Sequence, residues 1–188
     1  MAATDEQLAL NVQQGDKYAM QQLVLRHADR LTGYLYRMVH GDRALAEDLL
    51  QETFLRVLRG IEGYTYPRPF KPWLYAIATN AARAHFRRAD TRRTASHESF
   101  ELHPSQTANP EYQLERSQRA RRVTQALASL PDHQREAIIL FYYEELTIAE
   151  IAAVLAIPEG TVKSRLSIAR RRLRSALELE ESTHVTTG

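Results

Sequence analysis

Apolar residues recur at intervals of three and four through most of the chain, and segments with glycine or proline interrupt this pattern. Such spacing is typical of amphipathic helices. Residues that commonly cap helix N-termini, Thr4, Asp16 and Asp42, precede three of the apolar runs. The first ninety residues are therefore predicted to form four helices, over about 4–15, 16–39, 43–59 and 72–89. Because runs of β-branched residues are absent, the sequence predicts an all-α protein.

The stretch from 146 to 174 carries the strongest functional pattern. Thr147 and Glu150 form a capping box ahead of a short apolar helix, and Pro158 begins a second helix after a tight turn. Residues 160–174 contain six Lys or Arg and no acid. The second helix is predicted to turn one face to the core, with Val162, Leu166, Ala169 and Leu173.

A short apolar helix, a turn and a basic second helix favour a helix-turn-helix that reads the DNA major groove. The alternative is a basic helix on the surface of any small helical bundle. The small residues interleaved on the outward face favour the DNA reader, because close approach to base edges requires them. That outward face holds Gly160, Lys163, Ser164, Ser167 and Arg171.

Charge is distributed unevenly, although the net charge of the 188 residues is only +2. Residues 83–93 carry five Arg against one Asp, whereas residues 96–115 carry four Glu and no Lys or Arg. Two basic patches separated by an acidic segment predict DNA contacts on two lobes. The predicted organisation is an N-terminal domain over 1–90, a flexible acidic linker over 91–113, a helix-turn-helix domain over 114–179 and a disordered tail over 180–188.

Several functional classes are disfavoured by the composition. The chain has no cysteine, which excludes disulfides and cysteine-based zinc sites. No apolar stretch approaches the roughly 18 residues of a membrane span, and the N-terminus has no signal-peptide core. The 7 His show no ligand spacing, and no phosphate-binding glycine loop or catalytic motif is present. We therefore expect a cytoplasmic protein without membrane insertion, catalytic residues, metal or cofactor.

The third predicted helix has an outward face that its own core does not need. Helical projection places Ala46, Leu50, Phe54, Val57 and Leu58 toward the core. The other side carries Asp48, Glu52 and Leu55, flanked by Leu45, Leu49 and Gln51. This mixture suits docking on a partner with basic and apolar groups. A solvated face with a few exposed leucines is the alternative.

The fourth predicted helix and the loop before it offer a second nucleic-acid surface. Asn80, Arg83 and Arg87 form a polar strip beside a core face, and these side chains suit base-edge and phosphate contacts. Trp73 and Tyr75 are better placed for the core. The loop over 61–71, which is predicted not to be regular helix, has aromatic and cationic residues that suit stacking on unpaired bases. These are Tyr64, Tyr66, Arg68, Phe70 and Lys71.

Two blocks of the chain, in order, resemble a known family. AEDLLQETFLRVL (46–58) followed by PWLYAIATNAARAHFRR (72–88) resembles region 2 of the bacterial extracytoplasmic-function sigma factors, a group of the sigma-70 family. LPDHQREAIILFYYEELTIAEIAAVLAIPEGTVKSRLSIARRRLR (130–174) resembles their region 4. The resemblance implies an RNA polymerase sigma factor that binds core polymerase and directs promoter recognition, DNA melting and transcription initiation. Ala156 departs from the family, which often has a turn glycine there.

The resemblance also implies roles for the predicted surfaces. Asp48, Gln51, Glu52 and Leu55 would bind the β′ clamp helices, and the second lobe would meet the β flap. The 64–71 loop would capture a flipped base of the −10 element, while Asn80, Arg83 and Arg87 would hold the −10 strand. The −35 element would be read by Lys163, Ser164, Ser167 and Arg171 together with Gly160 and Thr161, and its phosphates bound by Arg165, Arg170 and Arg172. An anti-sigma factor is implied as a further partner.

Two other classes of protein remain as alternatives at this point. A stand-alone repressor would share the helix-turn-helix, but it normally needs a dimer interface and a palindromic site. An enzyme would need a catalytic constellation. The free chain is expected to bind promoters poorly, because each lobe makes few contacts and the linker from 96 to 115 leaves their spacing undefined.

Overall fold

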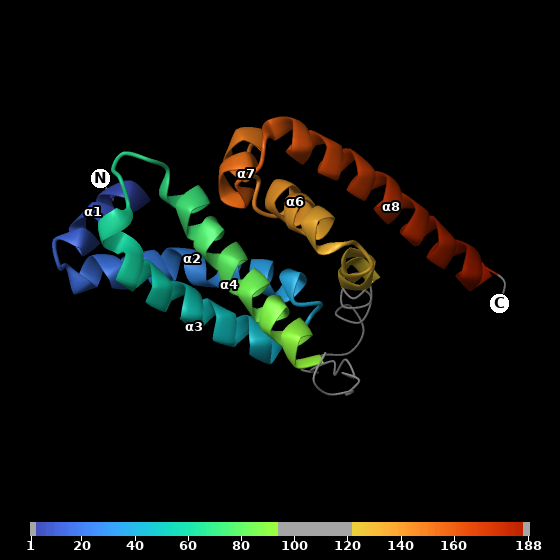
Figure 1. Ribbon diagram of the computed structural model, residues 1–188, viewed down its shortest axis with the longest axis horizontal. Helices are drawn as coiled ribbons and strands as arrows, with labels where there is room; N and C mark the ends of the chain where they lie inside the picture. The colour runs from blue at the N-terminus through green and yellow to red at the C-terminus, as the bar shows by residue number, and fades with distance from the viewer. Residues whose placement is uncertain (1–2, 94–121, 186–188) are drawn as a thin grey trace.

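The computed structural model describes residues 3–93 and 122–185, and every regular element in these ranges is helical (Figure 1). This confirms the all-α prediction. The N-terminal lobe consists of α1 (Asp5–Gln13), α2 (Lys17–Met38), α3 (Arg43–Gly60), the 3₁₀ turn η1 (Ile61–Gly63) and α4 (Phe70–Arg93). The C-terminal lobe consists of a helical segment over 122–128, α6 (Asp132–Tyr142), α7 (Ile148–Leu155) and α8 (Glu159–Val185).

Side-chain caps begin the first three helices where the sequence predicted them. Thr4 accepts a hydrogen bond from the Gln7 amide, and Asp42 accepts one from the Leu45 amide. Asp16 accepts bonds from two amides of the first turn of α2. Each cap satisfies amides that no helical carbonyl can reach, which contributes about 0.5–2 kcal/mol per helix. The helix starts are thus local properties of the chain.

The residues of α3 that are buried differ from those that helical projection predicted. Ala46, Leu49, Phe54 and Val57 are buried, whereas Leu58 is exposed. The expectations that Leu49 flanks the outward face and that Leu58 faces the core are therefore wrong. The buried stripe follows Ala46, Leu49 and Val57 because α2 and α4 both pack on that side, and Leu58 lies about 100° around the helix from Val57.

Helix boundaries around the 61–71 loop also differ from the prediction. Ile61–Gly63 form a 3₁₀ turn, and α4 begins at Phe70 rather than near Pro72. Proline is tolerated in a first helical turn because its missing amide has no partner there in any case. The earlier start is stabilised by Glu6 of α1, whose Oε1 accepts a hydrogen bond of 3.1 Å from the Phe70 amide.

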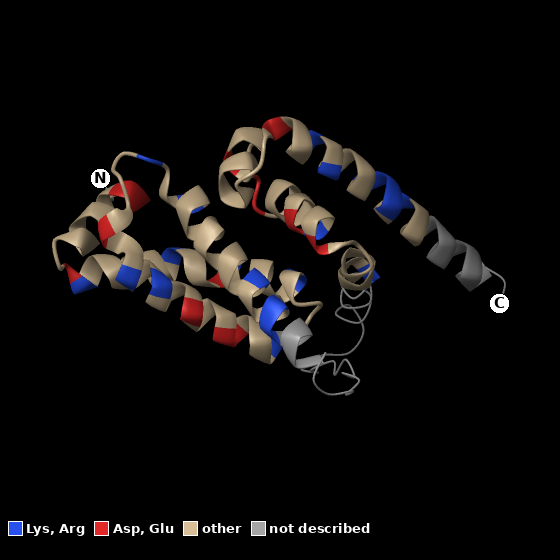
Figure 2. Ribbon diagram, viewed as in Figure 1, with Lys and Arg blue, Asp and Glu red and all other residues tan. Residues whose placement is uncertain are grey.

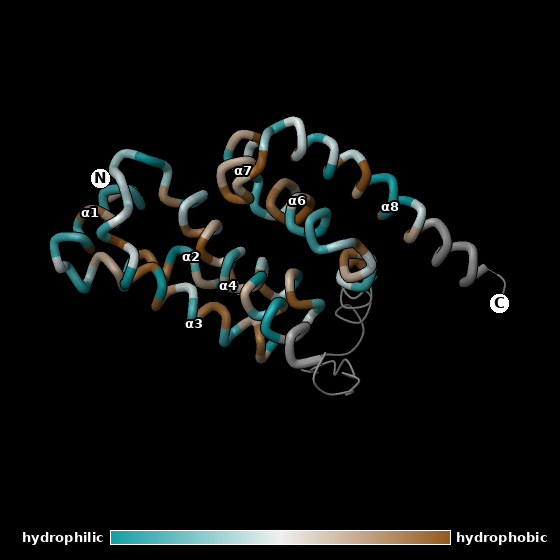
Figure 3. The backbone as a smooth tube through the Cα atoms, in the orientation of Figure 1, coloured by the Kyte–Doolittle hydropathy of each residue, from teal (hydrophilic) through white to brown (hydrophobic). Residues whose placement is uncertain are grey.

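The C-terminal lobe contains the predicted helix-turn-helix. Thr147 and Glu150 form the expected capping box of α7. Ala156 ends α7 in the left-handed region, with φ 54° and ψ 48°, so alanine here adopts a conformation that glycine adopts with less strain. Figure 3 shows α7 as a largely apolar helix, whereas hydrophilic stretches alternate with apolar positions along the coloured part of α8. The predicted core face of α8 is confirmed, because Val162, Leu166 and Ala169 are buried and Leu173 packs against them.

Helix α8 continues to Val185, beyond residue 179 where we expected the folded lobe to end. No glycine or proline stands between residues 161 and 185 to stop it, and leucine and glutamate favour helix over 177–181. The acidic linker predicted over 91–113 falls mostly outside the described residues, as do residues 186–188. Within the described ranges, none of the helices combines the length and the apolar character needed to cross a membrane.

The two lobes pack against each other. Helix α4 of the N-terminal lobe lies along α7, and α2 contacts α6 (Figure 1). At the end of α2, a Cβ added to Gly41 would stand 3.4 Å from the Thr124 methyl group of the C-terminal lobe. Helix α4 therefore has neighbours on two sides, which is why Tyr75 is fully buried while part of the predicted polar strip faces the other lobe.

Candidate nucleic-acid interface

The outward face of α8 is an exposed basic surface. Lys163, Ser164, Ser167, Arg170 and Arg171 are exposed, whereas Thr161 and Arg165 are half-buried. Figure 2 shows basic residues recurring along the described part of this helix. Gly160 is exposed, and a Cβ added to it would meet nothing within 4 Å. The surface is therefore accessible to a large partner such as duplex DNA.

Two arginines of α8 also make contacts within the C-terminal lobe. The Arg170 guanidinium stands 5.5 Å from the Phe141 ring centroid and 5.6 Å from that of Tyr142. Arg172 donates a hydrogen bond of 3.2 Å to Gln134. These contacts orient the two side chains along the flank of α8. A flanking position suits contacts with phosphates rather than with base edges.

The polar strip of α4 is divided between solvent and the C-terminal lobe. Asn80 and Arg87 are exposed. Arg83 donates two hydrogen bonds, of 2.7 and 2.6 Å, to the two carboxylate oxygens of Glu136 on α6. The Glu136 side chain is only 3% exposed and that of Arg83 is 29% exposed. The hydrogen bond to Glu136 raises the pKa of Arg83, and the two hydrogen bonds hold its guanidinium against the C-terminal lobe.

Glu144, in the turn after α6, holds two further residues of α4. The Tyr75 hydroxyl donates to the Glu144 carboxylate, and the Lys71 ammonium donates to the Glu144 carbonyl. Burial, and then the hydrogen bond to Glu144, raise the pKa of Tyr75. Burial, and then the nearby Arg30 charge, lower the pKa of Lys71. Lys71, Tyr75 and Arg83 thus form one face of α4 that contacts the C-terminal lobe.

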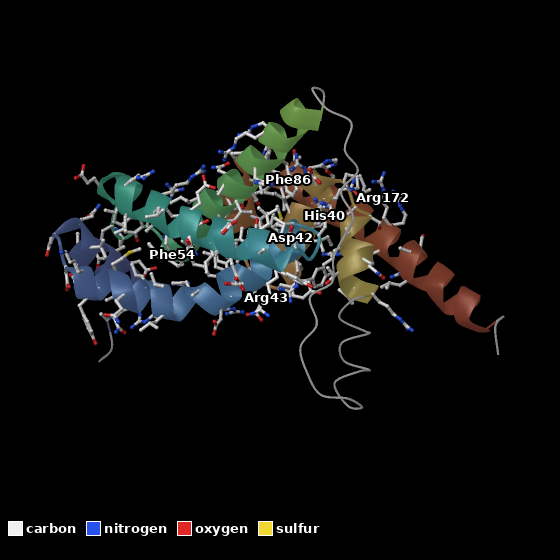
Figure 4. The ribbon with its side chains drawn as sticks, turned by 90° about the horizontal axis from the view of Figure 1, so that it is seen from below. His40, Asp42, Arg43, Phe54, Phe86 and Arg172 are labelled. Atoms are coloured by element: carbon white, nitrogen blue, oxygen red, sulfur yellow. The ribbon has the colours of Figure 1, made fainter. Side chains whose placement is uncertain are left out.

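Contacts from α2 extend the same inter-lobe surface. The Arg37 guanidinium lies 3.9 Å from the centroid of the Tyr143 ring, and Arg30 stands 4.0 Å from Glu145 in an exposed pair. Within the N-terminal lobe, His40, two residues after α2, packs edge-on against Phe86 of α4 (Figure 4). Burial, and then the charge of Arg135 on α6, lower the pKa of His40. We name the surface formed by Arg37–Tyr143, Arg30–Glu145 and Arg83–Glu136 the inter-lobe interface.

The aromatic residues of the 64–70 loop divide into two groups. Tyr64 and Phe70 are buried, whereas Tyr66 is 46% exposed. Both buried rings fill the core beneath the loop and leave no exposed face for a base, so the expectation that Tyr64 and Phe70 contact a base stays a prediction that this packing does not support. Arg68 is exposed beside Tyr66, so these two remain candidates for base contact.

Tyr64 and Phe70, which are buried, form an aromatic cluster with the half-buried Trp73. The Tyr64 ring centroid lies 5.8 Å from that of Phe70 and 5.3 Å from that of Trp73, and both pairs meet edge to face. The Tyr64 hydroxyl donates to the Arg68 carbonyl across the loop. Burial, and then the Glu6 charge, raise the pKa of Tyr64 to about 12, so the hydroxyl remains a donor at neutral pH. The cluster packs the two ends of the loop against the core.

The outward face of α3 carries most of the residues predicted for it. Asp48 and Gln51 are exposed, and Leu55 is 51% exposed. Glu52 is half-buried, because it accepts a bond of 2.6 Å from Arg56 and stands 3.7 Å from Arg88 of α4. Leu58, which helical projection placed toward the core, is exposed one turn after Leu55. Its spacing of three residues from Leu55 was the available signal.

Comparison with known proteins gives one family for both lobes. A family model described as Sigma-70 region 2 matches residues 23–92, and one described as Sigma-70, region 4 matches residues 120–173. The RNA polymerase sigma-H factor of Pseudomonas aeruginosa is 34% identical over 182 residues, which is 93% of this chain and 94% of that protein. The ECF RNA polymerase sigma factor SigE of Mycolicibacterium smegmatis is 38% identical over 172 residues, or 89% of this chain and 66% of that protein.

The fold agrees with this assignment. The sigma factor RpoE of Bartonella quintana, solved in complex with the anti-sigma factor NepR, superposes with a TM-score of 0.69 at 27% identity. The match covers 84% of this chain and 96% of that one. The chain belongs to the extracytoplasmic-function sigma factors of the sigma-70 family, which direct RNA polymerase to promoters and initiate transcription there.

Proposed function

We propose that the chain divides promoter recognition between its lobes, with α8 reading the −35 element and the 64–70 loop with α4 engaging the −10 element. The observation that carries this is the exposed face of α8 over residues 160–174, which contain no acid. The other side of this part of the helix is fixed by the buried Val162, Leu166 and Ala169. A rigid helix that presents small and basic side chains suits insertion into the major groove.

The −35 proposal separates base readers from phosphate binders. Arg171 is exposed opposite the core face, so Arg171→Ala is expected to cost about 1–3 kcal/mol at particular base pairs. Arg165→Ala is expected to weaken all promoters alike and to reduce the salt dependence, because a phosphate contact carries no sequence information. Holoenzyme affinities for a series of −35 variants at two salt concentrations test this. A uniform loss for Arg171→Ala would reverse the two roles.

For the −10 element, we propose contacts from the exposed part of the loop and of α4. Tyr66 and Arg68 suit stacking against, and hydrogen bonding to, an unpaired base. Asn80 and Arg87 suit the strand that leads to it. Arg83 and Lys71 join this surface only when the inter-lobe interface opens, because Glu136 and Glu144 hold them in the packed arrangement.

We propose that the exposed face of α3, formed by Asp48, Gln51, Leu55 and Leu58, binds the β′ clamp helices of core polymerase. It combines exposed leucines with an acidic rim, which supports docking on an apolar and basic partner. The C-terminal lobe would meet the β flap. Glu52 contributes to the negative charge of this face, but its pairs with Arg56 and Arg88 also give it a structural role.

Leu55→Ser is expected to weaken binding to core polymerase about tenfold, because an interface that buries this leucine loses about 1–2 kcal/mol when the side chain is removed. Leu25→Ser is the matched control, since Leu25 is 67% exposed on α2 and lies outside the proposed surface. A competition assay for core polymerase, with helical content checked by circular dichroism, measures both. Equal affinities for the two variants would exclude Leu55 from the interface.

Further assignments follow from the family. We propose that the chain acts in the cytoplasm, where bacterial core polymerase is found, and that it contributes binding rather than catalysis. We also propose an anti-sigma factor as a regulatory partner. The complex of the Bartonella quintana relative with the anti-sigma factor NepR supports this.

A further inference from the structure

Helix α1 contains no residue predicted to touch polymerase or DNA, and it lies before the 23–92 segment that matches sigma region 2. It nevertheless makes hydrogen bonds to both ends of the 64–70 loop. Two side chains of α1, Glu6 and Gln13, make these bonds. They are seven residues apart and so lie on the same face of the helix.

Gln13 holds the entry to the loop. Its Nε2 donates a hydrogen bond of 2.7 Å to the Ile61 carbonyl and another of 2.7 Å to the Tyr64 carbonyl. A carboxamide nitrogen carries two hydrogens, so both donors of Gln13 are used on this turn. One carbonyl belongs to the first residue of η1 and the other to the residue that follows it. The Gln13 side chain therefore holds the turn that precedes the loop.

Glu6 holds the exit from the loop. Its Oε1 accepts the 3.1 Å hydrogen bond from the amide of Phe70, the first residue of α4. Residues 65–69, which lie between the two held ends, are all exposed. Within the loop, the Arg68 amide donates a bond of 2.9 Å to the Thr65 carbonyl. The exposed segment is thus short and anchored at each end.

Helix α1 is itself held firmly enough to act as a support. Leu8, Ala9 and Val12 are buried against the rest of the lobe. Asp5 accepts bonds of 2.7 Å from His27 and 2.8 Å from Arg26 on α2. The hydrogen bond with His27 is the largest cause of the lowered pKa of Asp5, so this carboxylate is ionised at neutral pH. Helix α1 therefore packs mainly on α2, so its position does not depend on the loop alone.

We propose that Gln13 and Glu6 are positioning residues that hold the 64–70 loop in the shape that receives an unpaired base of the −10 element. This inference rests on the proposed role of that loop. Binding an extruded base in a preformed loop avoids the entropic cost of ordering the loop at the moment of binding. The residues act through backbone carbonyls and an amide, so they influence base preference without touching DNA.

Gln13→Glu tests the proposal, because glutamate has nearly the same size but an ionised carboxylate accepts hydrogen bonds only. It would place negative charge against the Ile61 and Tyr64 carbonyls. Gln14→Glu is the matched control, since it makes the same chemical change at the neighbouring exposed residue. Gln13→Lys restores a donor and is expected to recover part of the wild-type behaviour.

The measurement uses holoenzyme and four fork-junction DNAs that differ only in the unpaired −10 base, taken from a promoter that the holoenzyme transcribes. For Gln13→Glu, we expect the affinity ratio between the preferred base and the others to fall at least threefold. Affinity for core polymerase, affinity for duplex −35 DNA and the melting temperature should stay near those of Gln14→Glu. Tyr66→Ala and Arg68→Ala in the same assay report on the loop itself.

The outcomes distinguish the proposed role of the loop in base recognition from the proposed positioning role of Gln13. If the loop variants leave base preference unchanged, the proposed role of the loop is wrong. If they lower it and Gln13→Glu does not, the loop role stands and the positioning role is overturned. An equal loss of affinity for all four bases and for −35 DNA, with a lower melting temperature, would show that Gln13 only stabilises the fold, and would overturn the positioning role as well.

Discussion

Replacing Phe70 with alanine is expected to lower the free energy of unfolding of the N-terminal lobe by about 3–5 kcal/mol. The Phe70 side chain is fully buried and its ring packs against those of His27, Tyr64 and Trp73. The substitution removes apolar contact area and leaves a cavity that the cluster fills only in part. It is also expected to loosen the 64–70 loop, because Phe70 is the first residue of α4.

The single tryptophan of the chain makes this prediction direct to measure. Trp73 lies in the same cluster, so its fluorescence during urea unfolding of the full chain reports on the N-terminal lobe. Tyr66→Ala is the control, since this exposed side chain should change stability by no more than about 0.5 kcal/mol. If Phe70→Ala kept wild-type stability while losing −10 binding, Phe70 would be a base contact after all.

Neutralising Glu136 is expected to raise the affinity of the free protein for single-stranded −10 DNA about tenfold. Glu136→Gln removes the charge that holds Arg83, and breaking a buried ion pair costs about 3–5 kcal/mol when both partners are inaccessible. Arg83 retains access to water, so we expect a cost to the packed arrangement of about 1–3 kcal/mol. Since 1.4 kcal/mol is a factor of ten, the open population should rise accordingly.

The absence of cysteine allows the lobes to be labelled without other changes to the chain. Gln21→Cys on α2 and Ser175→Cys on α8, both at exposed positions, place a donor and an acceptor dye on separate lobes. Glu136→Gln should lower the energy-transfer efficiency as the lobes separate. Glu145→Gln is the control, because the 4.0 Å pair of Glu145 with Arg30 is exposed and contributes little.

Two results would contradict this prediction. Unchanged transfer and unchanged DNA affinity would mean that Arg83–Glu136 does not hold the lobes together. A rise in affinity with unchanged transfer would mean that the loss of one negative charge helps DNA binding without any opening. Core polymerase added to the wild-type protein should reproduce the fall in transfer if binding to core separates the lobes.

The features that the sequence alone determined are those controlled by near neighbours in the chain. Caps at Thr4, Asp16, Asp42 and Thr147 start helices through hydrogen bonds that span two or three residues. The core face of α8 follows from a spacing of three and four residues. These local rules were sufficient for the all-α fold and the helix-turn-helix. Together with the family motifs, they indicated the sigma factor function.

Only the tertiary structure decided which side chains of the candidate surfaces are accessible. Helical projection cannot tell how many neighbours a helix has. It therefore did not predict that α4 packs against both its own lobe and the C-terminal lobe, or that Leu49 is buried and Leu58 exposed. Tyr64 and Tyr66 are the same residue type, yet the core beneath the loop encloses Tyr64 and leaves Tyr66 exposed. Arg83–Glu136 and Gln13–Tyr64 join residues 53 and 51 positions apart. Contacts between residues so far apart produce no periodic pattern in a sequence. They depend on how the helices pack together and not on the order of residues within a single helix.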